Sequence, residues 1–509
     1  MYTPLRALDN LLNRITMYAL TQWGLRVLAT MAILLAFTGA LAQPWTGLLY
    51  SLLILSASVF TANVVFSKLF KVPVNAESFA ITLLILFFIL PPATTVERAV
   101  LLAMAGVLAI ASKFLITWND KHIFNPAAFA PVVLGTLGLL GASWWVGSAV
   151  LWPLVLVLGL LIVRKIRRFS VFLPFAAVSL LVIAATTFAE AGDVGEALRA
   201  TITASPLLFL GTIMLTEPST MPGRRHQQII FGALVGFLYA MPWDGKLFPL
   251  HIYPETALLL GNLYAFAVNP RYRLRLTLKS VEKVSDRVYN YVFTPDRQPD
   301  FLPGQYMEWT LPGVGMNLRG NRRTLSIASS PTEPAVMTGV KFYTPSSSYK
   351  KVLKDLKPGS VVYAGQIAGD FVLPADTSLK LLFVAAGIGV TPFRSMLKYV
   401  LDAREQRDIV LIYAVSDASE IAYADVLAAA EQQGIKVLRL LTARGDAPKD
   451  WQGSTGSLNA AFITAQVSDY KDRLAYLSGP NGMVQDVRAD LIRTGVSAAK
   501  VKTDYFTGY

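Results

Sequence analysis

The sequence predicts a multi-domain protein in which an all-α polytopic membrane bundle precedes an antiparallel β-barrel and a Rossmann-like α/β domain. Ten apolar segments recur before residue 270, as a membrane bundle requires. Apolar and polar residues then alternate with period two, as in half-buried strands. Near residue 379 a continuous apolar run leads through a glycine-rich turn into a helical pattern, which is typical of a nucleotide-binding unit.

The distribution of charge divides the chain at the same place. Residues 1–270 contain 16 Lys and Arg and 10 Asp and Glu, whereas residues 271–509 contain 30 and 23. The apolar half therefore faces a different solvent from the charged half. We predict four regions: an interfacial helix at 1–23, a transmembrane domain at 24–270, a β-barrel at 271–376 and an α/β domain at 377–509.

The membrane bundle is predicted from segment length and charge. The predicted spans lie near 24–42, 47–66, 77–91, 96–116, 126–141, 145–163, 171–189, 202–216, 227–241 and 252–268. If both termini are cytoplasmic, thirteen Lys and Arg residues fall on the cytoplasmic side and three on the outer side, which satisfies the positive-inside rule. Residues 4–22 have an amphipathic pattern that fits either an interfacial helix or a plain solvated one.

The absence of cysteine and the scarcity of histidine exclude several redox centres. A chain with no Cys forms no disulfide, no thiolate zinc site and no cysteine-ligated iron–sulfur cluster. Two stacked haems need four axial ligands, and the three histidines (His122, His226 and His251) all lie near predicted span ends. We therefore predict no metal site. We also predict no nucleic-acid binding, because no basic run is interleaved with aromatic residues.

Three stretches of the apolar half place polar residues at segment ends: Lys121–Phe129, Leu215–Pro222 and Tyr253–Glu255. Together they resemble the family of the B subunit of the sodium-pumping NADH:quinone reductase and the D subunit of the Rnf complex, over most of residues 20–268. The resemblance implies a multi-pass protein of the bacterial cytoplasmic (inner) membrane whose helical bundle carries electrons on a flavin. The implied flavin or quinone site comprises Asn125, Pro126, Glu217 and Pro218.

The sequence departs from this family at the covalent attachment point. Members with covalent FMN carry a Ser-Gly-Ala-Thr-type acceptor, and the nearest strings here, Pro92–Thr95 and Ala184–Thr187, lack the glycine. We therefore expect a non-covalent flavin, FMN or riboflavin, or else a quinone. Asn125 and Pro126 also suit a helix start, as cap and first-turn residue. Glu255, near the outer end of the tenth span, is either functional or an ordinary interfacial carboxylate.

In the charged half, Arg323 and Ser326 lie on one predicted strand, so a guanidinium and a hydroxyl are offered three residues apart. A guanidinium fork suits a pyrophosphate. The pair resembles the Arg-x-Tyr-Ser flavin motif of the ferredoxin–NADP reductase superfamily, with Leu325 in the place of Tyr. The resemblance covers residues 272–509 and implies FAD, with Ser326 reaching the flavin ring and Leu325 packing on it.

Two further stretches are expected to complete the FAD site. Ser346, Ser347 and Ser348 precede a short helix, where hydroxyls and unpaired backbone N–H groups meet. This arrangement suits a pyrophosphate, and it is equally an ordinary helix cap. By the resemblance, an aromatic residue at the end of the chain covers the flavin ring. Tyr509 is the first candidate and Phe506 the second, and simple core packing is the alternative for both.

The predicted NAD(P) site combines two glycine turns with an acidic residue. Gly387, Gly389, Thr391 and Pro392 lie between the apolar strand and its helix, where the backbone can approach a pyrophosphate. Ser478, Gly479, Pro480 and Met483 resemble the superfamily's nicotinamide-side turn. Asp417 follows the second strand, where a carboxylate accepts from a ribose hydroxyl and repels a 2′-phosphate, so NADH is predicted over NADPH.

The motifs together predict a membrane-bound oxidoreductase with a cytoplasmic reductase half. Electrons would pass from NAD(P)H through FAD to a flavin or quinone in the membrane half, and on to an unidentified acceptor. Ser326 and Ser478 are the predicted catalytic residues. The alternative is an ordinary reductase tethered to a membrane anchor or to a flavin or ion transporter. The expected partners are the lipid bilayer, NADH and that acceptor, which could be another membrane or extracytoplasmic redox subunit.

Overall fold

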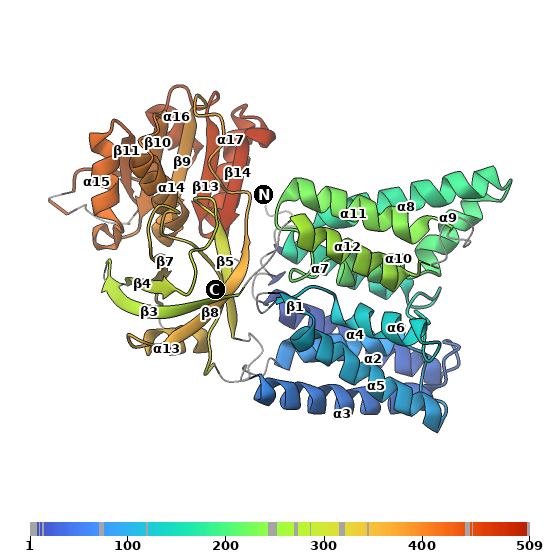
Figure 1. Cartoon of the computed structure of the whole chain (residues 1–509). Coiled ribbons are helices and arrows are strands. Elements are labelled where there is room, and N and C mark those ends of the chain that lie inside the picture. Colours follow the sequence, from blue (N-terminus) through green and yellow to red (C-terminus); the bar gives the residue numbers. More distant parts are fainter. Residues whose placement is uncertain are drawn as a thin grey trace. The chain divides into compact units, whose positions relative to one another are not determined.

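The computed structural model describes residues 8–9, 11–12, 15–70, 76–118, 121–242, 252–268, 273–285, 287–314, 321–343, 346–442, 448–449 and 451–505. The chain forms two compact units that meet in sequence near residue 273 (Figure 1). The first is helical and the second contains two six-stranded sheets. Each unit is described by itself.

The helical unit contains a helix in each of the ten predicted segments. Their bounds are α2 Met17–Phe37, α3 Trp45–Leu69, α4 Ala76–Ile89, α5 Val96–Leu115, α6 Pro126–Thr136, α7 Trp152–Ile166, α8 Phe169–Ala189, α9 Val194–Thr203, α10 Leu207–Phe209 continued by the π-helix η1 Leu210–Met214, α11 Arg225–Ala240 and α12 Pro254–Val268. A two-stranded hairpin, β1 Thr117–Trp118 and β2 Lys121–His122, joins α5 to α6.

The prediction of ten spans was wrong by the criterion of length. Among the described residues, α2, α3, α5 and α8 are long and apolar enough to cross a membrane, and a fifth span results if α9 and the α10–η1 helix, bent by 55°, count as one. Helices such as α4 and α6 are apolar but fall short of the roughly 20 residues that a span needs. The predicted boundary at residue 23 also falls inside α2, whose cap is Thr16.

The first sheet of the second unit is the predicted antiparallel barrel. Its strands are β3 Leu274–Lys283, β4 Val288–Pro295, β5 Tyr306–Thr310, β6 Arg322–Ser326, β7 Val336–Lys341 and β8 Val361–Ala368, in the order β6-β5-β8-β3-β4-β7. The short helix α13 Ser348–Lys354 lies between β7 and β8 in the chain. On β6, Arg323 pairs with Trp309 of β5 and Ser326 pairs with Tyr306, which fixes the register of the predicted flavin strand.

The second sheet is parallel and doubly wound (Figure 1). Its strands are β9 Leu381–Ala386, β10 Ile409–Val415, β11 Lys436–Leu441, β12 Ser454–Thr455, β13 Leu474–Gly479 and β14 Val501–Tyr505, in the order β12-β11-β10-β9-β13-β14. Helices α14 Thr391–Asp402 and α15 Ala424–Gln432 cover one face, and α16 Ala460–Gln466 and α17 Asn481–Arg493 cover the other. The strand order reverses between β9 and β13, and such switch points are where doubly wound sheets bind ligands.

Candidate functional site: a dinucleotide site and a polar membrane cluster

The two glycine turns of the predicted NAD(P) site meet at the switch point. A Cβ on Gly389 would collide with the backbone oxygen of Ser478 and lie 2.6 Å from the Cα of Gly479, so only glycine permits this approach. Gly387 and Gly479 have φ of +53° and +153°, and Gly387 adopts the left-handed conformation that glycine favours. The sequence therefore holds two backbone turns against each other at the carboxyl ends of β9 and β13.

Neighbouring residues fix the shape of these turns. The Thr391 hydroxyl donates to the carbonyl of Ile388 at 2.7 Å, closing the turn before α14. Pro392 occupies the first turn of that helix, where its missing N–H costs nothing. On the other turn, Pro480 precedes α17, and the Met483 side chain packs against Gly479.

The two predicted catalytic hydroxyls are both buried, and the part of the chain that the structure describes gives neither a hydrogen-bond partner. Ser326 is 2% exposed and Ser478 is 0% exposed, and neither Oγ atom has a hydrogen-bond partner among the described residues. An unsatisfied buried hydroxyl costs about 1–3 kcal/mol, so proteins rarely leave one without a purpose. A bound group that hydrogen-bonds to each hydroxyl would remove that cost.

Two cationic side chains lie close together at β6 and the start of α13. The Arg323 guanidinium is buried, donates to the carbonyl of Arg322 at 2.6 Å and lies 4.9 Å from the centre of the Tyr349 ring. Lys350 donates to the carbonyl of Lys341 at 2.7 Å. Burial, and then the charge of Arg323, lower the pKa of Lys350 to about 8. Two cations held this close favour binding of an anion such as a pyrophosphate.

The serine stretch begins α13 as a cap. The Ser347 hydroxyl accepts from the backbone N–H of Lys350 at 3.3 Å, whereas Ser348 is exposed in the first turn. Ser346 donates to the carbonyl of Tyr343. Capping is therefore the role that the structure gives Ser347. Leu325 is half-buried on β6, and Tyr509 and Phe506 lie outside the described residues.

Arg394 and Ser395 of α14 contact the residues that follow β6. We call this set of contacts the Arg394–Glu333 clasp, and the sequence analysis did not predict it. Arg394 donates to the carbonyl of Ala328 at 3.1 Å and forms a two-pronged ion pair with Glu333, whose Nη2–Oε1 distance is 2.9 Å. Ser395 donates to the carbonyl of Ser329 at 2.7 Å. The clasp fixes the barrel against the α/β domain, so the Ser326 side and the Gly389 side are held as one body.

The acidic residue after β10 has a structural partner. Asp417 is exposed and accepts from the backbone N–H and hydroxyl of Ser419, capping the short helix η3 Ala418–Glu420. These hydrogen bonds hold the pKa of Asp417 below its usual range, so it is negatively charged at neutral pH. Nearby, buried Glu420 pairs with Lys341 at 2.6 Å and accepts from Ser416 at 2.8 Å.

In the helical unit, all four predicted flavin or quinone residues line one cavity. Asn125, Pro126, Glu217 and Pro218 contribute to it, together with residues of α2, α4, α7 and η1. Asn125 accepts from the backbone N–H groups of Ala127 and Ala128, and it donates from Nδ2 to Glu217 at 2.8 Å. Asn125 is thus both the predicted helix cap and a partner of Glu217.

Residues distant in sequence complete the hydrogen-bond network of the polar cluster around this cavity. Asn262 of α12 accepts from the backbone N–H of Asn125 at 2.8 Å and donates to the carbonyl of Thr220. Thr220 in turn donates to Glu217, and the Nε2 atom of His122 lies 3.8 Å from Glu217. The sequence analysis did not identify Asn262. Its spacing of seven residues from Glu255 puts both residues on one helix face, and this spacing could have indicated it.

The two sites differ in the ligands that they can accommodate. The membrane cavity has a volume of about 70 Å³, below the roughly 300–1,000 Å³ of small-molecule sites, so it accommodates a few water molecules but not a flavin ring. In the second unit, the unsatisfied hydroxyls, the cation pair and the glycine approach fit a flavin dinucleotide and a nicotinamide dinucleotide. Glu255, the remaining candidate, is buried and accepts from the indole N–H of Trp144 at 2.7 Å.

Comparison with known proteins finds a family match in the second unit. Residues 383–489 match the family model described as an oxidoreductase NAD-binding domain. The chain is 30% identical over 208 residues to a stachydrine N-demethylase reductase subunit of Rhizobium meliloti, covering 40% of this chain and 58% of that protein. It is 28% identical to an NADPH oxidoreductase of Mycobacterium tuberculosis, covering 39% and 50%. The chain thus spans about half the length of these curated relatives.

A solved structure is similar over about half of the chain. The FAD/NAD-binding domain of a nitric oxide dioxygenase from Vibrio cholerae is 22% identical, with a TM-score of 0.41, covering 46% of this chain and 98% of that one. The family match confirms the predicted NAD-binding oxidoreductase domain of the C-terminal half, and the two curated relatives are a reductase subunit and an oxidoreductase. The resemblance of residues 20–268 to the pump subunits stays a prediction.

Proposed function

We propose that the protein is a membrane-bound flavoprotein that oxidises NADH on FAD held in its second unit. The observation that carries the proposal is the pair of buried, unsatisfied hydroxyls, Ser326 on β6 of the antiparallel sheet and Ser478 on β13 at the switch point of the parallel sheet. Each hydroxyl gains a hydrogen bond when its nucleotide is present. The low charge density and long apolar helices of the first half support location in the cytoplasmic membrane.

Different residues of the chain bind different parts of the two dinucleotides. Arg323 and Lys350 neutralise the pyrophosphate of FAD, Ser326 orients its ring, and Leu325 packs against it. Gly387 and Gly389 let the backbone approach the dinucleotide substrate, while Ser478 positions its nicotinamide end. FAD itself supplies the chemistry of accepting a hydride and releasing single electrons. The Arg394–Glu333 clasp keeps the two binding sides in register.

We propose further that the membrane half receives these electrons on a non-covalent flavin or quinone near Asn125 and Glu217. Supporting this, four residues chosen from sequence motifs line one cavity beside the buried polar cluster. Since the cavity is small, binding requires the start of α2, which contributes Met17, Tyr18 and Thr21, to move aside. From this carrier the electrons would continue to an acceptor in or beyond the membrane.

The small cavity also favours a second candidate function, a reductase anchored by a bundle that carries no cofactor. Flavin analysis of the purified full chain separates the two. After denaturation and extraction, the carrier proposal predicts FAD plus a second released flavin, or FAD plus NADH-driven reduction of an added quinone. The anchored reductase predicts one FAD per chain and no quinone reduction. A chain without FAD would contradict both.

A further inference from the structure

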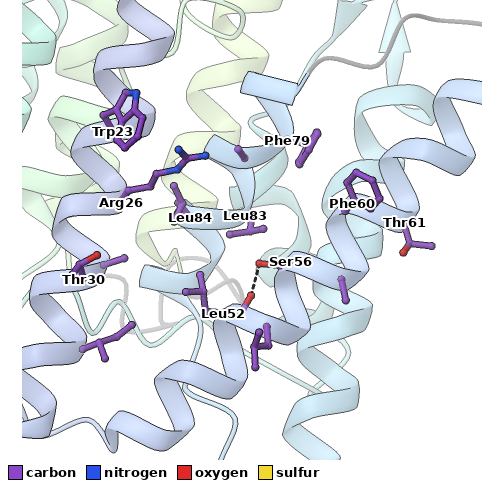
Figure 2. A pocket seen from close by; sticks show the side chains of 15 residues that line it. Trp23, Arg26, Thr30, Leu52, Ser56, Phe60, Thr61, Phe79, Leu83 and Leu84 are labelled. Carbon is purple, nitrogen blue, oxygen red and sulfur yellow. Dashed lines mark hydrogen bonds between the residues drawn. The ribbon is translucent and has the colours of Figure 1, made fainter. Parts of the chain in front are cut away.

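The helical unit contains a second, much larger hollow that the proposed electron path does not use. Helices α2, α3 and α4 enclose an open groove of about 1010 Å³ (Figure 2). Its walls are mainly apolar, with Ile33 on α2, Leu52 and Phe60 on α3, and Phe79 and Leu83 on α4. Ser56 points its hydroxyl back to the carbonyl of Leu52 at 2.6 Å, so it adds no free donor to the wall. The groove therefore suits a hydrocarbon chain.

One charged residue, Arg26, lies in the lining of this groove. It lies in the N-terminal half of α2, near the cytoplasmic end of the predicted span 24–42, and its side chain extends from that helix toward α4 in Figure 2. Its guanidinium carbon lies 5.0 Å from the ring centre of Trp23, one turn earlier on the helix. Within the described part of the chain, no carboxylate lies within ion-pair distance of Arg26. A cation inside an apolar helix is costly unless an anion or water meets it.

We propose that the groove binds an anionic phospholipid, with an acyl chain along the apolar walls and the headgroup phosphate against Arg26. An anion and a hydrocarbon chain on one molecule satisfy both features of the groove at once. A quinone tail would fill the walls equally well, but its neutral headgroup gives Arg26 no counter-charge. Trp23 beside Arg26 provides the amphipathic ring that is common at headgroup level.

The lipid site is separate from the polar cavity, although α2 and α4 contribute residues to both. Phe79, Leu83 and Leu84 of α4 face the groove, whereas Ser78, Thr82 and Ile85 of the same helix face the cavity near Asn125. A bound lipid would therefore pack against the face of α4 that does not line the polar cavity. Retention of the lipid is expected to stabilise the helical unit without being needed for NADH oxidation by the second unit.

Native mass spectrometry of the full chain tests the proposal. The protein is equilibrated in mixed micelles that contain phosphatidylglycerol and phosphatidylcholine of one chain length in equal amounts, together with a polyprenyl quinone. We expect one retained phosphatidylglycerol per chain, favoured about five-fold over phosphatidylcholine, as one cation near a headgroup gives. Arg26→Gln should abolish the preference and Arg26→Lys should retain it. Ala57→Trp, which fills the groove, should lower retention of both lipids.

Matched controls make the outcome decisive. Arg98→Gln removes an exposed arginine that contacts Thr94 and should leave the lipid preference unchanged. Unchanged FAD content and NADH oxidation in every variant show that the protein is folded, and they separate this proposal from the proposed function. Equal retention of the two phospholipids by the wild type, retention of quinone instead, or an undiminished preference in Arg26→Gln would overturn the proposal.

Discussion

The candidate dinucleotide site and the polar membrane cluster contain similar kinds of residue, yet they differ in how many of their buried polar atoms have hydrogen-bond partners. In the dinucleotide site, Ser326 and Ser478 are buried with no hydrogen-bond partner among the described residues. In the cluster, Asn125 uses its amide to cap α6 and to hold Glu217. A ligand site can contain polar groups that have no hydrogen-bond partner until the ligand binds. In a cluster that holds helices together, the polar groups bind one another. His122, whose Nε2 atom is unsatisfied, is the exception in the cluster.

Removing the guanidinium of Arg323 should produce the largest effect. Arg323→Ala loses a charge-assisted contact of about 1.5–3 kcal/mol, which lowers FAD affinity about ten- to hundred-fold. Titration of the apoprotein with FAD measures it. Arg322→Gln is the matched control on the same strand, because Arg322 pairs with Glu308 and should affect FAD affinity little. Unchanged affinity in Arg323→Ala would remove Arg323 from the site.

The charge at Asp417 should decide between the two nicotinamide nucleotides. Asp417 is ionised at neutral pH and repels a 2′-phosphate, so the wild type should have the higher kcat/KM with NADH. Asp417→Arg should shift the ratio of NADPH to NADH kcat/KM upward by about ten-fold, since one favourable contact of about 1.4 kcal/mol replaces a repulsion. A wild type that uses NADPH equally well or better would contradict the assignment.

Substitutions of Asn125 test whether the membrane cluster has a structural role. Asn125→Ala removes a helix cap worth about 0.5–2 kcal/mol and one donor to Glu217, so the helical unit should unfold at a lower temperature. NADH oxidation with a soluble acceptor should not change. Asn125→Asp keeps the cap and replaces the donor by a repelling carboxylate, which distinguishes the two roles. Loss of a second flavin or of quinone reduction in Asn125→Ala would instead make the cluster a carrier site.

Lys350 should give FAD binding a modest pH dependence. Its pKa in the folded protein without FAD is about 8, so Lys350 loses its proton as pH rises through 8 and attracts the pyrophosphate less. FAD affinity should therefore fall a few-fold between pH 7 and 9, whereas Lys350→Met should flatten this dependence. Because the unfolded chain keeps this proton up to its higher pKa, the apoprotein should gain stability between pH 8 and 10.5. Flavin titrations and thermal unfolding across this range measure both effects.

Sequence reasoning succeeded where a feature is local. The Gly387–Pro392 turn, the Arg323–Ser326 strand and the Ser347 cap are short patterns whose geometry follows from residues within a few positions. The contacts that complete each site are long-range: Asn262 lies 137 residues from Asn125, and Glu333 lies 61 residues from Arg394. No periodicity links such pairs, so their pairing could not be predicted from one sequence.

The span count was wrong for a related reason. Apolar segments near 77–91 and 126–141 were counted as spans, but α4 and α6 are shorter than a span, and many of their residues pack inside the helical unit. Apolar composition marks a segment that avoids water, whether protein or lipid covers it. Tyr509, the predicted flavin cover, lies outside the described residues and stays a prediction.

Anaerobic mixing of the FAD-loaded full chain with NADH tests the central claim most directly, with Ser326→Ala and Ser478→Ala beside the wild type. The flavin absorbance of the wild type should bleach in a single rapid phase. Each variant should keep its FAD but bleach more slowly, because a hydroxyl that meets flavin or nicotinamide is missing. A wild type whose FAD is not bleached by NADH, or variants that bleach at the wild-type rate, would contradict the account.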